Sequence, residues 1–163
     1  MALEQEVKVY QSQLAYGEML LEGLAADKAF ELICDGGVNP AWIMGHLGLV
    51  ANNITAMAGG QPKIDVEQWK PLFGGGTTPA TDASAYPAWD ELVSVWKQGH
   101  ADVADAIPSI SEEVLSGENP IELLRPILMT THDFLSFALT AHESMHMGQL
   151  STWRRVQGQP PLF

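Results

Sequence analysis

The sequence predicts an all-α fold, a four-helix bundle with two long connections, forming a single domain over residues 1–163. Four segments carry apolar residues at alternating steps of three and four positions, which is the spacing of one helix face. Residues that favour the start or the end of a helix flank these segments. No segment alternates apolar and polar residues as a half-buried strand does. Amphipathic helices bury their apolar faces by packing against one another, so a bundle is expected.

The first two helices are expected at about residues 3–25 and 40–58. Asn39 and Pro40 mark the start of the second, because an Asn side chain accepts a hydrogen bond from a free amide and Pro suits the first helical position. The first apolar stripe consists of Leu3, Val7, Tyr10, Leu14, Gly17, Leu21 and Leu24. The second consists of Trp42, Ile43, His46, Leu49, Val50, Asn53 and Met57.

The other two helices are expected at about residues 87–107 and 131–158. Thr130 and Asp133 are spaced as a capping box, which favours a helix start at this point, and Gly158 favours a helix end. The third stripe consists of Trp89, Leu92, Trp96, Gly99 and Val103. The fourth consists of Leu135, Ala138, His142, Met145, Gln149, Thr152 and Val156.

The connections and two glycines indicate how the helices pack. Residues 61–86 are expected to be irregular but packed against the bundle, because they contain large apolar side chains. Residues 108–129 are expected to hold one or two short elements. Gly45 and Gly48 are poor helix formers within the second helix, so they indicate a neighbouring element that approaches closely.

Composition narrows the classes of partner. The net charge is -12 with only eight basic residues, which argues against nucleic acid, since phosphate binding needs clustered Lys and Arg. No run reaches the roughly 18 apolar residues of a membrane helix, and the acidic N-terminus does not resemble a signal peptide. Cys34 is the single cysteine, which fits a reducing compartment. We therefore expect a cytoplasmic protein that acts on a small molecule and binds neither membranes nor nucleic acid.

Three histidines are candidate ligands of a divalent metal ion. His142 and His146 are four residues apart, so their side chains lie on one helix face within reach of one ion. His142 lies within the apolar stripe of its helix, as His46 does in the second helix. A shared ion would satisfy all three imidazoles, which are common ligands of zinc and similar metals, and leave a coordination position open.

A simpler interpretation remains open. Chance alone produces i,i+4 histidine pairs at a modest rate, and a buried imidazole can instead bond to a carbonyl oxygen or to Gln149. His132 lies about 15 Å along the helix axis from His142, at 1.5 Å per residue, so it cannot share that ion. His100 is expected to be an ordinary core or surface residue of the third helix.

The string His142-Glu143-Ser144-Met145-His146 also matches the HExxH pattern of zinc peptidases. That pattern would make Glu143 a general base acting on water at the metal, while a solvated helix position is the alternative. A peptidase is a minor alternative, because no His, Asp or Glu follows His146 to serve as third ligand and no substrate-aligning strand is predicted.

Two segments resemble the motifs of the DinB-like (YfiT-type) proteins. Residues 39–47, Asn-Pro-Ala-Trp-Ile-Met-Gly-His-Leu, resemble the family's W-x-x-G-H-L motif. Residues 142–150, His-Glu-Ser-Met-His-Met-Gly-Gln-Leu, resemble its H-x-x-x-H-x-G-Q-L motif. The resemblance implies a four-helix bundle, a nickel or zinc site on His46, His142 and His146, and a homodimer. It also implies thiol-dependent transferase or isomerase activity, with a cofactor such as bacillithiol, mycothiol or glutathione, or a metal-dependent hydrolase.

We therefore expect a metal-dependent enzyme whose ion activates a water or a low-molecular-weight thiol. Gln149, one turn from His146, is expected to support a ligand from outside the coordination sphere. Arg154 would either attract an anionic substrate or complement the end of its helix. The alternatives are a non-catalytic metal-binding protein and an interaction bundle without metal.

Overall fold

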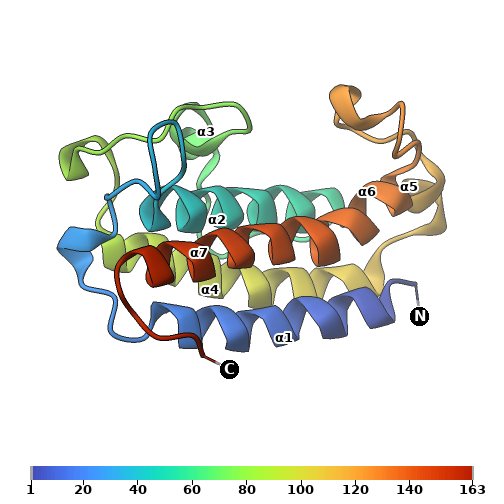
Figure 1. The fold of residues 1–163 in the computed structure, drawn as a ribbon. Helices are drawn as coiled ribbons and strands as arrows, with labels where there is room; N and C mark the ends of the chain where they lie inside the picture. The colour runs from blue at the N-terminus through green and yellow to red at the C-terminus, as the bar shows by residue number, and fades with distance from the viewer. Residues whose placement is uncertain (1, 163) are drawn as a thin grey trace.

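The computed structural model describes residues 2–162, and its centre is a bundle of long helices (Figure 1). These are α1 (Glu4–Leu21), α2 (Pro40–Met57), α4 (Trp89–Ala106) and a last helix made of α6 (Thr131–Phe137), a π-helical turn (Ala138–His142) and α7 (Glu143–Val156). Around the bundle the order of neighbours is α1, α7, α2 and α4. The predicted all-α fold is confirmed.

Both long connections carry short elements. The first contains 3-10 turns at Glu67–Trp69 and Ala83–Ala85 around α3 (Lys70–Phe73). Trp69 and Phe73 are buried, so this connection packs on the bundle as expected. The second contains α5 (Glu112–Ser116) and a 3-10 turn at Glu122–Leu124. Further 3-10 turns follow α1 at Ala26–Lys28 and α4 at Ile107–Ser109.

The helix starts follow the predicted capping chemistry. Asn39 Oδ1 accepts a hydrogen bond from the Trp42 amide at 2.8 Å. Thr130 and Asp133 form a complete capping box at the start of α6. The ends differ by a few residues from the prediction. Helix α1 stops at Leu21 rather than near residue 25, just before Gly23 takes the left-handed conformation with φ of 74°.

The close approach predicted from glycines is confirmed. A Cβ atom at Gly48 would lie 2.9 Å from Val95 Cγ1 of α4, and one at Gly99 would lie 2.5 Å from Ala51 Cβ of α2. These small residues therefore let α2 and α4 touch. A Cβ atom at Gly45 would lie 2.5 Å from the Phe73 ring, so this glycine admits the first connection against α2.

The π-helical turn in the last helix is a departure from the uninterrupted helix that the apolar stripe predicts. A π turn leaves main-chain carbonyl groups without their usual partners. Gln13 of α1 is buried and supplies its side-chain amide to Leu139 O at 3.2 Å and Thr140 O at 3.4 Å. The partner of the turn is thus a residue more than 120 positions away in sequence, which the local pattern does not reveal.

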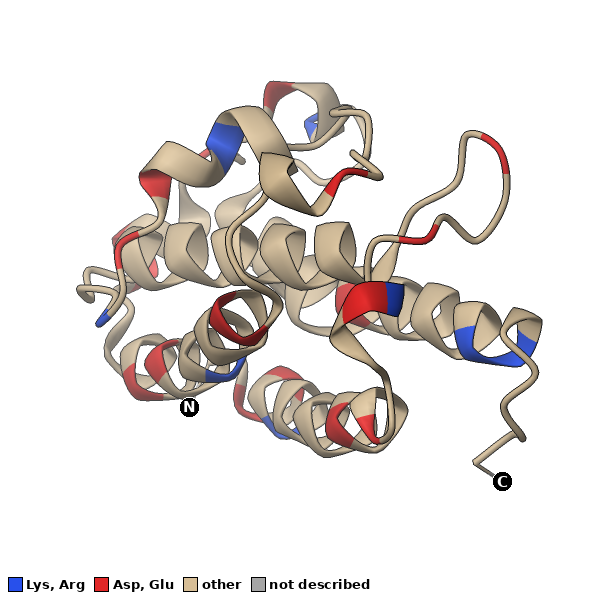
Figure 2. Ribbon diagram, turned by 90° about the vertical axis from the view of Figure 1, so that its left-hand side faces the viewer, with Lys and Arg blue, Asp and Glu red and all other residues tan. Residues whose placement is uncertain are grey.

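Acidic residues outnumber basic ones, 20 to eight. Asp and Glu are spread over several helices and connections, while the few Lys and Arg residues form no dense patch (Figure 2). Within residues 2–162, none of the helices combines the length and apolar character needed to cross a bilayer.

Candidate metal centre

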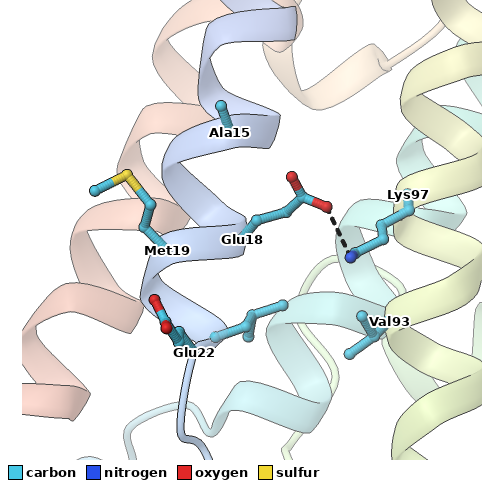
Figure 3. A pocket seen from close by; sticks show the side chains of 7 residues that line it. Ala15, Glu18, Met19, Glu22, Val93 and Lys97 are labelled. Carbon is cyan, nitrogen blue, oxygen red and sulfur yellow. Dashed lines mark ion pairs between the residues drawn. The ribbon is translucent and has the colours of Figure 1, made fainter.

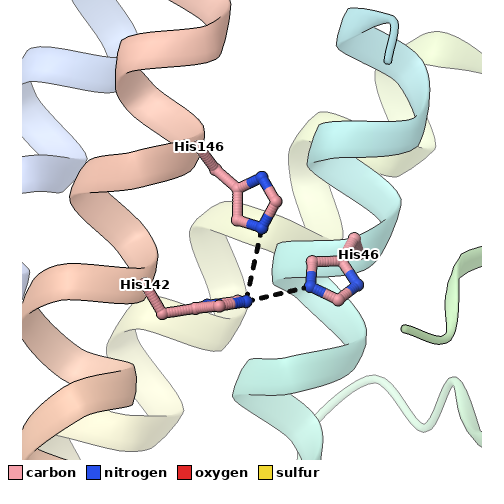
Figure 4. A group of neighbouring side chains, drawn as sticks. All are labelled: His46, His142 and His146. Atoms are coloured by element: carbon pink, nitrogen blue, oxygen red, sulfur yellow. Dashed lines mark hydrogen bonds between the residues drawn. The ribbon is translucent and has the colours of Figure 1, made fainter. Parts of the chain in front are cut away.

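The structure brings His46, His142 and His146 together between α2 and the last helix (Figure 4). His142 Nε2 lies 3.1 Å from His46 Nε2 and 3.3 Å from His146 Nε2. One ligand atom from each of the three residues lies within 4.8 Å of the other two. His46 and His146 are buried, and His142 is partly exposed, so the cluster lies at the edge of the bundle interior.

Two of the rings are oriented by hydrogen bonds from their outer nitrogens. His46 Nδ1 donates to Phe73 O at 2.7 Å, and His146 Nδ1 donates to Gln149 Oε1 at 2.7 Å. Because a carbonyl oxygen only accepts, each Nδ1 carries the proton and each Nε2 presents a lone pair to the cluster. The Trp42 ring stacks on the His46 ring with centroids 4.7 Å apart and fixes its plane.

The three histidines cannot provide hydrogen-bond partners for all of their own ring nitrogens. His142 holds one ring proton when neutral, and its Nδ1 is buried without a hydrogen-bond partner. A proton on Nε2 can serve only one of the two lone pairs that face it, and a proton on Nδ1 leaves three lone pairs facing one another. A cation accepts all three lone pairs at once, so the donor set fits a divalent metal ion.

The spacing of the nitrogens agrees with coordination chemistry. Tetrahedral zinc holds nitrogen ligands at about 2.0–2.1 Å, which sets neighbouring nitrogens about 3.3–3.4 Å apart. The observed separations of 3.1 and 3.3 Å lie near this value. Among the described residues, no carboxylate or thiol joins the three imidazoles in the cluster. A four-coordinate ion held by the three imidazoles would have one position left for a water or a substrate atom.

The environment keeps the three imidazoles neutral, the form that binds metals. Burial and, next, the charges of His142 and His46 lower the pKa of His146 to about 3. Burial and the charge of His46 lower the pKa of His142 to about 4, against an opposing effect of Glu143. Burial also lowers the pKa of His46, opposed by its bond to Phe73 and by Glu143. At neutral pH a cation therefore displaces no proton from these rings.

Glu143 faces the bundle interior. Its side chain is 2% exposed, and its Oε1 accepts hydrogen bonds from Trp96 Nε1 at 3.1 Å and His100 Nε2 at 3.0 Å. The alternative of a solvated helix residue is therefore wrong, because both donors belong to α4 in the core. The carboxylate is directed to α4, and it lies outside the histidine cluster.

His100 lies in the core, one of the two positions expected for it, but its bond to Glu143 was not predicted. It is 1% exposed, bonds to Glu143, and stacks on Tyr10 of α1 with ring centroids 3.8 Å apart. Its position four residues after Trp96, on the buried face of α4, was the available signal. His132 lies exposed in α6, separate from the cluster, as expected.

Gln149 and Arg154 have clear structural positions. Gln149 bonds to His146, as expected of a residue that supports a ligand. Arg154 is buried and donates from one guanidinium nitrogen to Leu20 O at 2.7 Å and Glu22 O at 2.8 Å. Arg154 therefore provides donors for carbonyl groups at the end of α1. These bonds engage it in place of the two expected roles, which were to complement the end of its own helix and to attract an anionic substrate.

A surface groove of about 550 Å³ lies between α1 and α4 (Figure 3). The histidines lie between α2 and the last helix, which the order of helices places on the other side of the bundle. An ion pair between Glu18 and Lys97, 2.7 Å long, crosses it. The groove lining contains no histidine and no cysteine. The groove is therefore separate from the candidate metal centre.

Comparison with known proteins bears on the same residues. A family model described as the DinB superfamily matches residues 12–150, a range that includes all three clustered histidines. Neither the curated proteins nor the solved structures contain a match. Since the match covers most of the sequence, this chain belongs to the DinB superfamily.

Proposed function

We propose that this protein is a metal-dependent enzyme that binds nickel or zinc through His46, His142 and His146 and transfers or rearranges groups with a low-molecular-weight thiol. The observation that carries the proposal is that His142 Nε2 lies 3.1 Å from His46 Nε2 and 3.3 Å from His146 Nε2. The three rings hold too few protons to form a hydrogen bond at each of these contacts. A divalent ion bound there would polarise a substrate or lower the pKa of a thiol or water that reaches it.

The residues around the cluster have defined tasks in this proposal. Phe73 O and Gln149 Oε1 fix the tautomers of two ligands, so that their Nε2 atoms are available without a change of protonation. Trp42 covers one face of His46 and excludes water from it. His142 is partly exposed, which makes its side the route by which a small molecule approaches.

Among the described residues, no carboxylate belongs to the histidine cluster, which supports thiol chemistry over peptide hydrolysis. An HExxH peptidase needs its glutamate beside the reacting water. Here Glu143 is engaged by Trp96 and His100, and among residues 2–162 no carboxylate belongs to the cluster. A thiol needs no general base once its pKa is lowered, so it suits a site built from three imidazoles alone. A metal-dependent hydrolase is the second candidate, since the open position equally admits water.

Elemental analysis of protein purified without a histidine tag tests the metal site. We expect about one nickel or zinc ion per wild-type chain and almost none in the His46→Ala/His142→Ala double variant. His132→Ala is the matched control, because His132 is an exposed histidine outside the cluster, and it should retain the ion. Equal metal content in the double variant and the wild type would refute the site.

Turnover assays test the reaction. Metal-loaded protein is supplied with several low-molecular-weight thiols and electrophiles, and the same protein after chelation is the control. Thiol-dependent turnover that disappears on chelation supports the transferase or isomerase proposal. Hydrolysis without any thiol would favour the second candidate. A loaded site with neither activity would indicate a non-catalytic metal-binding protein.

A further inference from the structure

Glu143 is a buried acid without a basic partner. Trp96 and His100 supply its two hydrogen bonds, both to Oε1. Among residues 2–162, no lysine or arginine forms an ion pair with it, and His100 is its only ion-pair candidate. An indole N–H can only donate, so Glu143 Oε1 is the acceptor of that bond. Burial of an ionised carboxylate is unfavourable unless an opposite charge compensates it.

His100 does not supply that opposite charge. The residue is 1% exposed, and its Nδ1 is buried without a hydrogen-bond partner. A protonated imidazole would carry a hydrogen on Nδ1 and leave a charged donor unpaired in the core. The neutral form with its proton on Nε2 donates to Glu143 and leaves only a lone pair unpaired. The geometry therefore leaves the Glu143 carboxylate without a lysine or arginine partner among the described residues, and the unpaired Nδ1 disfavours a charged His100 in that role.

The negative charge lies beside the candidate metal centre. Glu143 directly follows His142 in the last helix, so neighbouring residues carry the buried carboxylate and one of the ligand rings. Charges on neighbouring residues in a site with little solvent interact with little screening. Three neutral imidazoles contribute no charge, so a divalent ion would bring two uncompensated positive charges into a site with little solvent.

We propose that Glu143, held by Trp96 and His100, is the internal counter-charge of the metal centre, and that it strengthens cation binding while destabilising the metal-free protein. This inference rests on the proposed metal site. It assigns Glu143 as a positioning and electrostatic residue rather than a catalytic base. A carboxylate kept behind the ligands attracts the ion and leaves the open coordination position to the substrate.

The substitution Glu143→Gln tests the inference, because it removes the charge and keeps the size of the side chain. We expect zinc affinity, measured by competition with a chromophoric chelator, to fall about 10- to 100-fold. The melting temperature of the metal-free variant should equal or exceed that of the metal-free wild type. Zinc should therefore raise the melting temperature of the variant less than that of the wild type.

Asp102→Asn is the matched control, since Asp102 is another buried carboxylate but one with a lysine partner. It should lower the metal-free melting temperature and change zinc affinity less than about 2-fold. Trp96→Phe is the second variant: it removes a hydrogen bond but keeps the charge, so zinc affinity should stay within about 3-fold of wild type.

The possible results distinguish failure of the counter-charge inference from failure of the proposed metal site. Unchanged zinc affinity in Glu143→Gln would overturn the counter-charge inference and leave the metal site intact. An equal loss of affinity in Trp96→Phe and Glu143→Gln would also overturn it, because helix position rather than charge would then control binding. A wild-type protein that binds no zinc or nickel would refute the proposed function as well.

Discussion

Glu143 and Asp102 are both carboxylates buried in the same bundle, at 2% and 4% exposure, but their surroundings differ. Asp102 accepts hydrogen bonds from the Lys63 main-chain amide and from Gln98, each at 2.8 Å. The Lys63 ammonium group lies 3.4 Å away and extends toward solvent. Glu143 has Trp96 and His100 as donors, and among the described residues no lysine or arginine pairs with it. Under the proposed function, the chain compensates Asp102 itself and leaves Glu143 to the bound ion.

The difference follows from where each residue lies. Asp102 is near enough to the surface for the long side chain of Lys63 to reach it, with 59% of that side chain still exposed. Glu143 lies between α7 and α4, where a lysine would have to bury its whole length. A buried acid of that kind beside three neutral imidazoles is typical of a functional site rather than of stabilising architecture.

The largest effect on folded stability is expected from a fall in pH, which acts on the histidines of the cluster rather than on the two carboxylates. His142 and His146 have pKa values lowered to about 4 and about 3, against 6.5 for an ordinary histidine. The unfolded chain therefore binds more protons than the folded chain below pH 6.5, and folded stability falls as the pH falls from there toward 3 to 4. At pH 4.5 the loss for the metal-free protein is on the order of 5 kcal/mol relative to pH 7.

Urea unfolding of metal-free protein at a series of pH values measures this loss. The double variant His142→Ala/His146→Ala should show a flatter dependence, because the two rings with the lowest pKa values are gone. Glu143→Gln should steepen it, since the carboxylate favours protonated His142 and His46. The same slope in the wild type and the double variant would contradict the assignment.

The next effect concerns the partners of the two carboxylates. His100→Leu keeps most of the volume but removes a hydrogen bond from buried Glu143, so the metal-free protein should lose about 3 kcal/mol of unfolding free energy. Lys63→Ala removes an exposed partner of Asp102 and should lose no more than about 1 kcal/mol. Chemical denaturation of both variants gives the comparison. Equal losses would show that the two carboxylates depend alike on their partners.

Much of the bundle follows from local sequence, and the reason is physical. Helix periodicity, the Asn39 cap and the Thr130 capping box involve residues within one or two turns of each other. The i,i+4 spacing of His142 and His146 is local as well, and His46 entered the prediction through its place on an apolar stripe and the motif around it. The structure brings these three residues together.

The interactions that sequence could not predict join distant segments. The hydrogen bonds of Glu143 depend on which residues of α4 face α7, and periodicity alone does not fix that rotation. The π turn depends on Gln13 of α1, and the place of Arg154 depends on where α1 ends. Side-chain hydrogen bonds to distant carbonyl groups leave no pattern in local sequence, so polar residues in the core were the hardest to assign.

The smallest effect expected at the metal centre concerns Gln149, which bonds to a ligand ring and, unlike Glu143, carries no charge. Gln149→Leu removes the acceptor of His146 Nδ1 and frees that ring to change tautomer or rotate. Zinc affinity should fall about 10-fold, the lower end of the range for such partners, with metal-free stability nearly unchanged. Calorimetric titration with zinc measures the change in affinity.

Gln149→Glu separates orientation from packing at this position. A carboxylate oxygen can accept the same hydrogen bond from His146, so affinity should return to at least the wild-type value. Restored binding would place Gln149 with Phe73 O as a group that fixes a ligand tautomer. If Glu fails to restore binding, while the metal-free protein remains as stable as wild type, the hydrogen bond to His146 is not what Gln149 contributes. The centre would then depend on charge from Glu143 far more than on the orientation of its rings.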